Sequence, residues 1–279
     1  MITKATFIFD GLYGKTLGDI TFPKDKENLP LIVFLHGFKG FKDWGAFNHA
    51  ADYFASQGFA FAKFNFFYNG TTLEKPVDFA DLNRFSKNTY LKELEEAHHF
   101  INHAPSLLEE KYNFKSENIY LIGHSRGGGI AVLTAAQNEK VDKLVTWSSV
   151  ADFFTRFPLD LNQEEWKKDE YVYVANKRTG QELPMHFNFY EEAMRNKEKL
   201  DILTHAQSMD TPYLIIHGGS DEAVDINNAE KLKSATPNSE LHIEPHAGHT
   251  FRVSHPFEEE TLPDNFQNVL EKTLSFLKK

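Results

Sequence analysis

Short runs of apolar residues recur along the chain and alternate with longer stretches of helical periodicity. A run that is apolar at nearly every position is typical of a strand covered on both faces, as in a parallel sheet. The segments between these runs place apolar residues three and four positions apart, which indicates amphipathic helices. We predict strands at 31–37, 59–66, 118–125, 143–149, 213–219 and, near an edge, 239–246, and helices at about 46–57, 90–104, 127–138, 226–235 and 264–277.

This alternation of strands and helices predicts an α/β protein with a mostly parallel, doubly wound sheet. Two early segments, 5–9 and 14–22, are separated by turn residues and indicate an antiparallel hairpin at one edge. The rhythm breaks between about residues 151 and 200. There YVYVAN and the turn residues NKRTG predict a second hairpin, and EEAMRNKEKLDIL predicts a helix. We expect one domain over 1–279 with a small cap inserted at about 151–200.

The composition excludes several classes of function. The chain has 279 residues, a net charge of −10 and no cysteine. An acidic surface repels phosphate backbones and anionic lipids, so we expect no nucleic-acid partner and no membrane partner. The lack of cysteine excludes disulfides and thiolate chemistry. No secretory signal is visible at the start of the sequence, and a cytoplasmic location is the simplest interpretation.

A candidate nucleophile lies between a predicted strand and a predicted helix, where residues 123–127 read Gly-His-Ser-Arg-Gly. A sharp strand-to-helix turn lifts a serine above the carboxyl edge of the sheet. The flanking glycines leave room for the strained serine backbone, and the amides at the start of the following helix stabilise negative charge beside it. An ordinary exposed serine in a glycine-rich turn is the alternative. The strand and the helix on either side favour Ser125 as a nucleophile.

A serine hydroxyl needs a base to accept its proton, and histidine has a pKa suited to this role at neutral pH. In proteins with such a turn, the acid and then the histidine follow the serine along the chain. His249 lies in HAGHTF, between the last predicted strand and the final helix. Its position favours it over three other histidines, His242, His246 and His255.

The acid is expected after the strand at 213–219, in the segment HGGSDEAVD. A buried carboxylate there would hold the imidazole in one tautomer and stabilise the imidazolium. Asp225 directly precedes a predicted helix and fits the role of a helix N-cap. Asp221 lies earlier on the loop, so we predict that it is the partner of His249.

Two backbone amides are expected to bind the oxyanion of an acyl-transfer intermediate, because such a site needs donors that are already oriented. One comes from the loop after the first long strand, which ends in His36-Gly37-Phe38, and one from the residue after the serine. We predict that these donors are the N–H groups of Phe38 and Arg126, and that His36 is structural.

Four segments together resemble the α/β-hydrolase superfamily over almost the whole chain: HGF at 36–38, GHSRGG at 123–128, HGGSDEAV at 217–224 and GH at 248–249. Within it, the sequence is similar to the dienelactone-hydrolase and serine-aminopeptidase-like group, and within that group to bacterial feruloyl and cinnamoyl esterases. The segment HGFKGFKDW resembles the corresponding loop of those esterases. This resemblance implies the α/β-hydrolase fold, ester hydrolysis without a cofactor, and a pocket formed partly by the cap. True dienelactone hydrolases use a cysteine nucleophile, which this chain lacks.

The sequence therefore predicts a serine hydrolase that cleaves small-molecule carboxylic esters through an acyl-enzyme, with neither cofactor nor metal. Two alternatives stay open: a peptidase or amidase with the same triad, and a non-catalytic module that binds a ligand. The helical spacing of Glu95, His99 and His103 lacks the HExxH arrangement of a zinc site and favours a solvated face. Three basic residues near the predicted site would suit a carboxylate-bearing substrate or a solvated surface equally well: Lys39, Lys42 and Arg126. The oligomeric state is left open.

Overall fold

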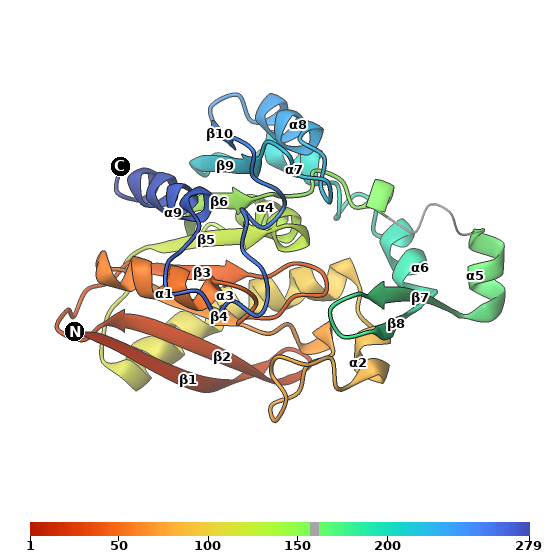
Figure 1. Cartoon of the computed structure of the whole chain (residues 1–279), viewed down its shortest axis with the longest axis horizontal. Coiled ribbons are helices and arrows are strands. Elements are labelled where there is room, and N and C mark those ends of the chain that lie inside the picture. Colours follow the sequence, from red (N-terminus) through yellow and green to blue (C-terminus); the bar gives the residue numbers. More distant parts are fainter. Residues whose placement is uncertain (157–161) are drawn as a thin grey trace.

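A single large sheet organises the structure, a computed structural model that describes residues 1–156 and 162–279 (Figure 1). The sheet has eight strands in the order β1-β2-β4-β3-β5-β6-β9-β10. The six strands from β4 to β10 pair in parallel, whereas the β1–β2 hairpin is antiparallel and forms one edge. The strands are β1 (Ile2–Gly11), β2 (Gly14–Pro23), β3 (Leu31–Leu35), β4 (Ala60–Phe64), β5 (Ile119–His124), β6 (Val141–Trp147), β9 (Tyr213–Gly218) and β10 (Glu240–Glu244). The predicted parallel α/β sheet is confirmed, with β10 at the second edge.

Helices cover both faces of the sheet. Buried side chains of α1 and α9 pack on one face, and those of α3, α4, α7 and α8 belong to the core on the other face (Figure 1). The helices are α1 (Phe47–Ser56), α2 (Leu82–Ser86), α3 (Tyr90–Tyr112), α4 (Arg126–Gln137), α5 (Gln163–Asp169), α6 (Asn188–Arg195), α7 (Ile202–Gln207), α8 (Asn227–Ala235) and α9 (Asp264–Leu277), with short 3-10 turns at Phe67–Asn69 and Phe154–Arg156.

Strand β3 shows why the central strands are apolar at every position. Leu31, Val33 and Leu35 point into one core, whereas Ile32 and Phe34 point into the other. Successive side chains of a strand face opposite sides of a sheet, so a sheet covered on both faces needs no polar position in its middle. All five residues of β3 are buried, as the unbroken apolar run predicts.

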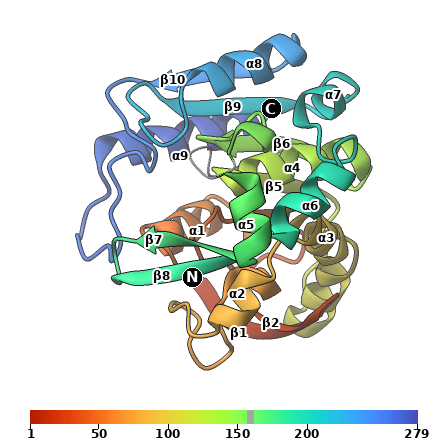
Figure 2. The ribbon, with the colours of Figure 1, turned by 90° about the vertical axis from the view of Figure 1, so that its right-hand side faces the viewer.

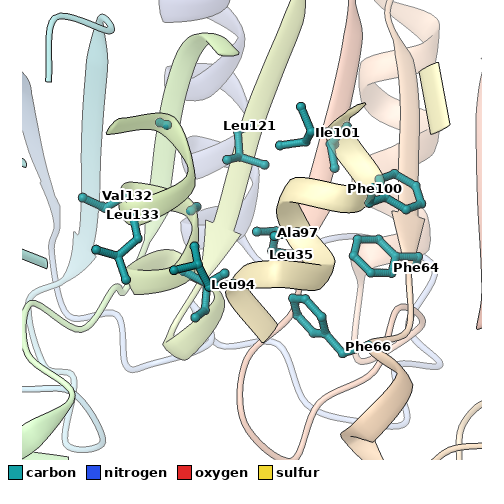
Figure 3. Packing of buried hydrophobic residues seen from close by; sticks show 14 of the residues in the cluster. Leu35, Phe64, Phe66, Leu94, Ala97, Phe100, Ile101, Leu121, Val132 and Leu133 are labelled. Carbon is teal, nitrogen blue, oxygen red and sulfur yellow. The ribbon is translucent and has the colours of Figure 1, made fainter. Parts of the chain in front are cut away.

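Helix α3 is longer than the sequence predicted. The prediction ended at residue 104, before Pro105, but the helix continues to Tyr112. Proline removes one backbone hydrogen bond, but it ends a helix only if packing does not compensate. Here Leu108 is fully buried one turn beyond the proline. Earlier in the helix, Phe100 stacks on Phe64 of β4 with 4.1 Å between ring centroids (Figure 3).

The prediction of a single helix over residues 191–203 is wrong in detail, because two short helices occupy this region. Helix α6 ends at Arg195, and α7 begins after Asp201, whose carboxylate accepts a hydrogen bond from the Thr204 amide at 3.1 Å. An aspartate at this position favours a helix start over a helix interior, because its side chain satisfies a free amide of the first turn.

The second predicted hairpin is confirmed and lies beyond the carboxyl ends of the central strands (Figures 1 and 2). It consists of β7 (Tyr171–Asn176) and β8 (Gln181–His186), which pair antiparallel. We call residues 163–195, which comprise α5, β7, β8 and α6, the hairpin segment. Trp166 of α5 is buried and donates a hydrogen bond to the Met185 carbonyl at 3.2 Å. The insertion predicted at 151–200 includes residues 157–161, which lie outside the described residues, and the assignment of a single domain with a cap stays a prediction.

None of the helices in the two described ranges has both the length and the apolar character that a bilayer span requires.

Helix α3 also contains a buried carboxyl group that makes stability depend on pH. Burial raises the pKa of Glu96 to about 8, although the Phe67 amide donates a hydrogen bond to it at 2.7 Å. In the unfolded chain this group titrates near a pKa of about 4.3. Between these two values the folded protein binds more protons than the unfolded protein, so the free energy of unfolding falls as pH rises.

We predict that Glu96→Gln removes this dependence. The variant and the parent protein should have about the same free energy of unfolding near pH 4.5. Above pH 8 the variant should be more stable by a few kcal/mol, because the difference between the folded and unfolded pKa values of Glu96 sets the size of the effect. Denaturant unfolding at a series of pH values measures the difference. Glu110→Gln, at an exposed position of the same helix, is the control. Parallel stability curves for Glu96→Gln and the parent protein would contradict the prediction.

Candidate active site

Ser125 occupies the turn between β5 and α4 in a strained backbone conformation, with φ of 59° and ψ of −121°. Non-glycine residues rarely adopt such angles, and they persist where the surrounding structure enforces them. The Ser125 amide donates to the Trp147 carbonyl of β6 at 3.0 Å, and the Ser125 carbonyl accepts from the Gly128 amide at 3.0 Å. These bonds hold the serine at the carboxyl end of β5, with the first turn of α4 directly behind it. The predicted strand-to-helix turn is confirmed.

Two glycines allow α4 to pack this closely against the strand ends. A Cβ atom on Gly123 would lie 2.3 Å from the Gly127 carbonyl oxygen, and one on Gly127 would lie 2.4 Å from the His36 carbonyl oxygen. Neither contact is possible for a real side chain. The glycines are therefore required by the contact of the helix with β3 and β5, in addition to the relief of the serine backbone that the sequence suggested.

Asp221 and His249 are in direct contact. His249 Nδ1 lies 2.8 Å from Asp221 Oδ2, and the other carboxylate oxygen accepts hydrogen bonds from the amides of Ala223 at 2.9 Å and Val224 at 2.8 Å. Burial alone would raise the pKa of Asp221, but the hydrogen bond from His249, the charge of His249 and the Val224 amide hold it below its ordinary value. The carboxylate is thus ionised and fixed, and it orients the imidazole with Nδ1 as the donor.

A further histidine connects the serine turn to the His249 loop. His124, the residue before Ser125, is buried, and its Nε2 lies 3.1 Å from the His249 carbonyl oxygen. Burial lowers the pKa of His124 to about 3, so the ring is neutral and donates through Nε2. Ser125 and His249 both line one cavity of about 380 Å³. The structure therefore brings all three predicted residues to the carboxyl edge of the sheet, with Asp221 and His249 bonded to each other.

The competing residues have other partners. His242 pairs with Glu244 at 3.0 Å, and His255 accepts a hydrogen bond from the Gly45 amide at 2.9 Å. His246 is exposed. Asp225 accepts from the Asn227 amide at 2.9 Å and so satisfies an amide at the start of α8, although Ile226 is the residue that immediately precedes this helix.

The loop after β3 lies against Ser125. A Cβ atom on Gly37 would be 2.8 Å from the Ser125 Cβ atom, so the loop backbone touches the serine. In residues 1–156 and 162–279, neither the Phe38 amide nor the Arg126 amide donates a hydrogen bond. His36 is buried, its ring contacts the Gly37 carbonyl at 3.0 Å, and burial lowers its pKa to about 4, in keeping with a structural role.

The side chains of Phe38 and Arg126 also contact each other. The Arg126 guanidinium lies 3.9 Å from the centroid of the Phe38 ring, and it pairs with the buried Glu93 of α3 at 3.4 Å. Burial raises the pKa of Glu93, and the Arg126 charge opposes that rise. The sequence left open whether Arg126 faces solvent or substrate. The structure instead places its side chain in an internal ion pair, packed against the Phe38 ring.

A network of two buried lysines and two partly buried aspartates anchors the other end of the same loop. Lys42 and Asp43 of the loop contact Asp19 of β2 and Lys63 of β4, and each lysine bonds to both aspartates. The Lys63 side chain is 1% exposed and the Lys42 side chain 4%. Two positive and two negative charges balance, which is the condition for burying ions at tolerable cost. Lys42 is therefore structural and does not face a substrate.

We predict that Lys63→Met destabilises the protein by about 3–5 kcal/mol, because it removes a buried cation and leaves two partly buried carboxylates with one cation. The free energy of unfolding in urea measures this loss. Lys4→Met is the matched control. It breaks the exposed pair of Lys4 and Asp52, which is expected to contribute less than about 1 kcal/mol. Similar stabilities for the two variants would show that the network is not an anchor.

A second cavity, of about 440 Å³, meets the first at Ser125. Phe38 and Ala175 also line both cavities. Because Ala175 belongs to the hairpin segment, this segment forms a wall shared by the two cavities. The second cavity is mainly apolar and aromatic; its lining consists of Phe38, Tyr90, Ser125, Arg126, Val150, Phe153, Tyr173, Val174, Ala175 and Met185. The first cavity differs in carrying three basic side chains, those of Lys39, Lys177 and Arg178.

Sequence reasoning missed the contribution of the β7–β8 turn. Asn176, Lys177 and Arg178 line the first cavity, but the sequence NKRTG was interpreted only as turn residues. Two adjacent basic residues at a hairpin tip were the available signal. This tip lies more than 50 residues after Ser125 in the chain, and nothing in the local sequence indicates that it lines the same cavity.

The sheet order and the serine turn are those of an α/β hydrolase, and the comparisons with solved structures agree. Est1E from Butyrivibrio proteoclasticus with bound ferulic acid has a TM-score of 0.76 at 20% identity, covering 98% of this chain and all of that chain (100%). A putative dienelactone hydrolase from Klebsiella pneumoniae has a TM-score of 0.60 at 16% identity, covering 97% and 98%. The acylaminoacyl peptidase of Pyrococcus horikoshii has a TM-score of 0.67 at 18% identity, covering 99% of this chain and 41% of that one.

A family comparison narrows the assignment within this fold. The BD-FAE family model matches residues 18–236, and the chain belongs to this family. The resemblance to feruloyl esterases and dienelactone hydrolases that the motifs indicated is thereby confirmed. A comparison with curated protein sequences gives no match.

Proposed function

We propose that this protein is a serine hydrolase that cleaves carboxylic esters through an acyl-enzyme, with Ser125 as nucleophile, His249 as base and Asp221 as the acid. The observation that supports this most directly is the 2.8 Å contact between His249 Nδ1 and Asp221 Oδ2 in a loop that shares a cavity with Ser125. With Nδ1 as donor, the free Nε2 of the imidazole is the acceptor that a serine hydroxyl requires.

In the proposed reaction, Ser125 Oγ attacks the ester carbonyl and its proton passes to His249 Nε2. The carbonyl oxygen becomes an oxyanion, which the amides of Phe38 and Arg126 stabilise. His249 then returns the proton to the departing alcohol oxygen, and the acyl group stays on Ser125. A water molecule, deprotonated by His249, attacks the acyl-enzyme, and the same steps release the acid. Asp221 stabilises the imidazolium each time it forms.

The position of His249 assigns the two cavities to the two halves of the ester. The departing oxygen receives its proton from His249, so the alcohol part must lie on the side of that histidine. His249 lines the first cavity, whereas the second cavity contains Ser125 and Arg126. We therefore place the alcohol part in the first cavity and the acyl part in the apolar second one. Aromatic acyl groups suit its lining, and the structurally similar Est1E holds ferulic acid.

We predict that Ser125→Ala lowers the turnover of 4-nitrophenyl esters by about a thousandfold or more, because nucleophile, base and acid act as a unit. The rate of 4-nitrophenol release measures this loss. A fluorophosphonate probe should label the parent protein and not the variant, which separates an enzyme from a non-catalytic module of the same fold. Turnover by Ser125→Ala near the parent rate would overturn the assignment.

A peptidase or amidase with the same triad is the second candidate, because a peptidase is among the structures of similar fold. An aminopeptidase-like site needs an acidic group to bind a free amino terminus. The described lining of the two cavities contains no aspartate or glutamate, and Glu164, Glu165 and Glu170, which might have served, are exposed and lie outside it.

We predict that the kcat/KM for an acyl ester exceeds that for the aminoacyl anilide of matched size by at least about a hundredfold, equivalent to roughly 2.7 kcal/mol in the barrier. Side-by-side steady-state assays with both substrates measure this ratio. A higher kcat/KM for the anilide would favour the peptidase function, and Ser125→Ala serves as the blank for both substrates.

A further inference from the structure

We propose that the first cavity contains an anion-binding subsite, formed by Lys39, Lys177 and Arg178, that receives a carboxylate on the alcohol part of the ester. The assignment to the alcohol part rests on the proposed function. The binding of the carboxylate itself does not, and it is tested separately below.

The three cations of this subsite differ from the other basic residues near Ser125 in having no acidic partner among the described residues. Lys42 and Arg126 are neutralised by buried carboxylates. In contrast, none of the three subsite cations forms a salt bridge within the part of the chain that the structure describes. Unpaired positive charges that share one cavity are unusual in a chain with a net charge of −10. They produce a local positive potential that attracts an anionic ligand.

Lys39 lies close to the hairpin segment that carries the other two cations. Burial is the main cause that lowers the pKa of Lys39, and the positive charges of Lys177 and Arg126 lower it further. Lys39 Nζ donates to the Ala175 carbonyl at 3.2 Å, which directs the amine toward the hairpin segment that carries the other two. Like charges held together in this way repel each other, and a bound carboxylate would relieve that repulsion.

An unsatisfied buried donor in the same cavity is a second, independent observation. Asn176 is 6% exposed, and its side-chain nitrogen is buried without a hydrogen-bond partner among the described residues. A buried donor without an acceptor costs about 1–3 kcal/mol, so such groups generally mark a site where a ligand or water completes the bonding. Asn176 lines the first cavity beside Lys177 and Arg178, and a carboxylate oxygen would supply the missing acceptor.

The rest of the cavity indicates what carries the carboxylate. Trp44, Phe47 and His255 also line it, so the cavity has aromatic walls as well as cations. The turn of the β7–β8 hairpin lies beside the loop between β10 and α9, and this loop carries both His249 and His255 (Figures 1 and 2). An alcohol with a ring body and a carboxylate at its far end would contact the aromatic walls and the cations at once.

A binding experiment tests the subsite without catalysis. Isothermal titration calorimetry should show that 4-(hydroxymethyl)benzoate binds at least about tenfold more tightly than the neutral 4-(hydroxymethyl)benzamide, which has the same shape. Added NaCl should weaken only the benzoate, because the attraction is electrostatic. Equal affinities of the parent protein for the two compounds would overturn the subsite.

Variants locate the effect. In Lys177→Gln/Arg178→Gln, the preference for the benzoate should fall to about twofold or less, because two of the three charges are gone. Lys167→Gln/Lys168→Gln removes the same charge from exposed positions of α5 in the same segment, outside both cavities, and should keep the full preference. Equal losses in the two variants would mean that net charge alone, and not this cavity, attracts the anion.

Turnover tests the assignment to the alcohol part. The 4-carboxybenzyl ester of an aromatic acid should have a kcat/KM about tenfold above that of its 4-carbamoylbenzyl ester, through KM, whereas moving the carboxylate to the acyl part should bring no gain. Ser125-dependent hydrolysis without the carboxylate preference would overturn the assignment to the alcohol part and leave the esterase proposal intact. Benzoate-selective binding without Ser125-dependent hydrolysis would support the subsite and overturn the esterase proposal.

Discussion

The contact of α4 with the ends of β3 and β5 is the constraint on which the site depends. It brings the helix backbone so close to the strands that only hydrogen atoms fit at Gly123 and Gly127. With the helix start fixed there, Ser125 has no room to relax from its unusual backbone angles. The serine is therefore held by the packing of the main chain.

Charge pairing separates the framework of the site from the surfaces that would contact a substrate. Arg126 with Glu93, and Lys42 and Lys63 with Asp19 and Asp43, are closed sets in which every charge has a counterpart. Such sets fix the loop of Phe38 and the start of α4, and breaking one would leave an uncompensated buried ion. The first cavity has the opposite character, since its cations and the amide of Asn176 have unused binding capacity.

Much of the fold and of the site follows from local sequence. Each central strand is an unbroken apolar run because it is covered on both faces, and GHSRG lies between a strand and a helix because of the turn it makes. His249 and Asp221 could be predicted because parallel strands deliver the loops after them to one edge. The continuation of α3 through Pro105 could not, since it depends on burial of Leu108 against distant parts of the chain. Nor could the internal pairing of Arg126, because its partner, Glu93, is 33 residues away.

The β7–β8 ribbon supplies part of both cavity walls, and yet its strands form no part of the main sheet. Its tip holds Asn176, Lys177 and Arg178, of which the last two are exposed and contribute little to the hydrophobic core. We therefore expect that substitutions at this tip can alter which molecules enter the first cavity without destabilising the sheet and helices that support it. Such an arrangement would let ligand selectivity evolve through substitutions in one exposed ribbon, with the framework of the site unchanged.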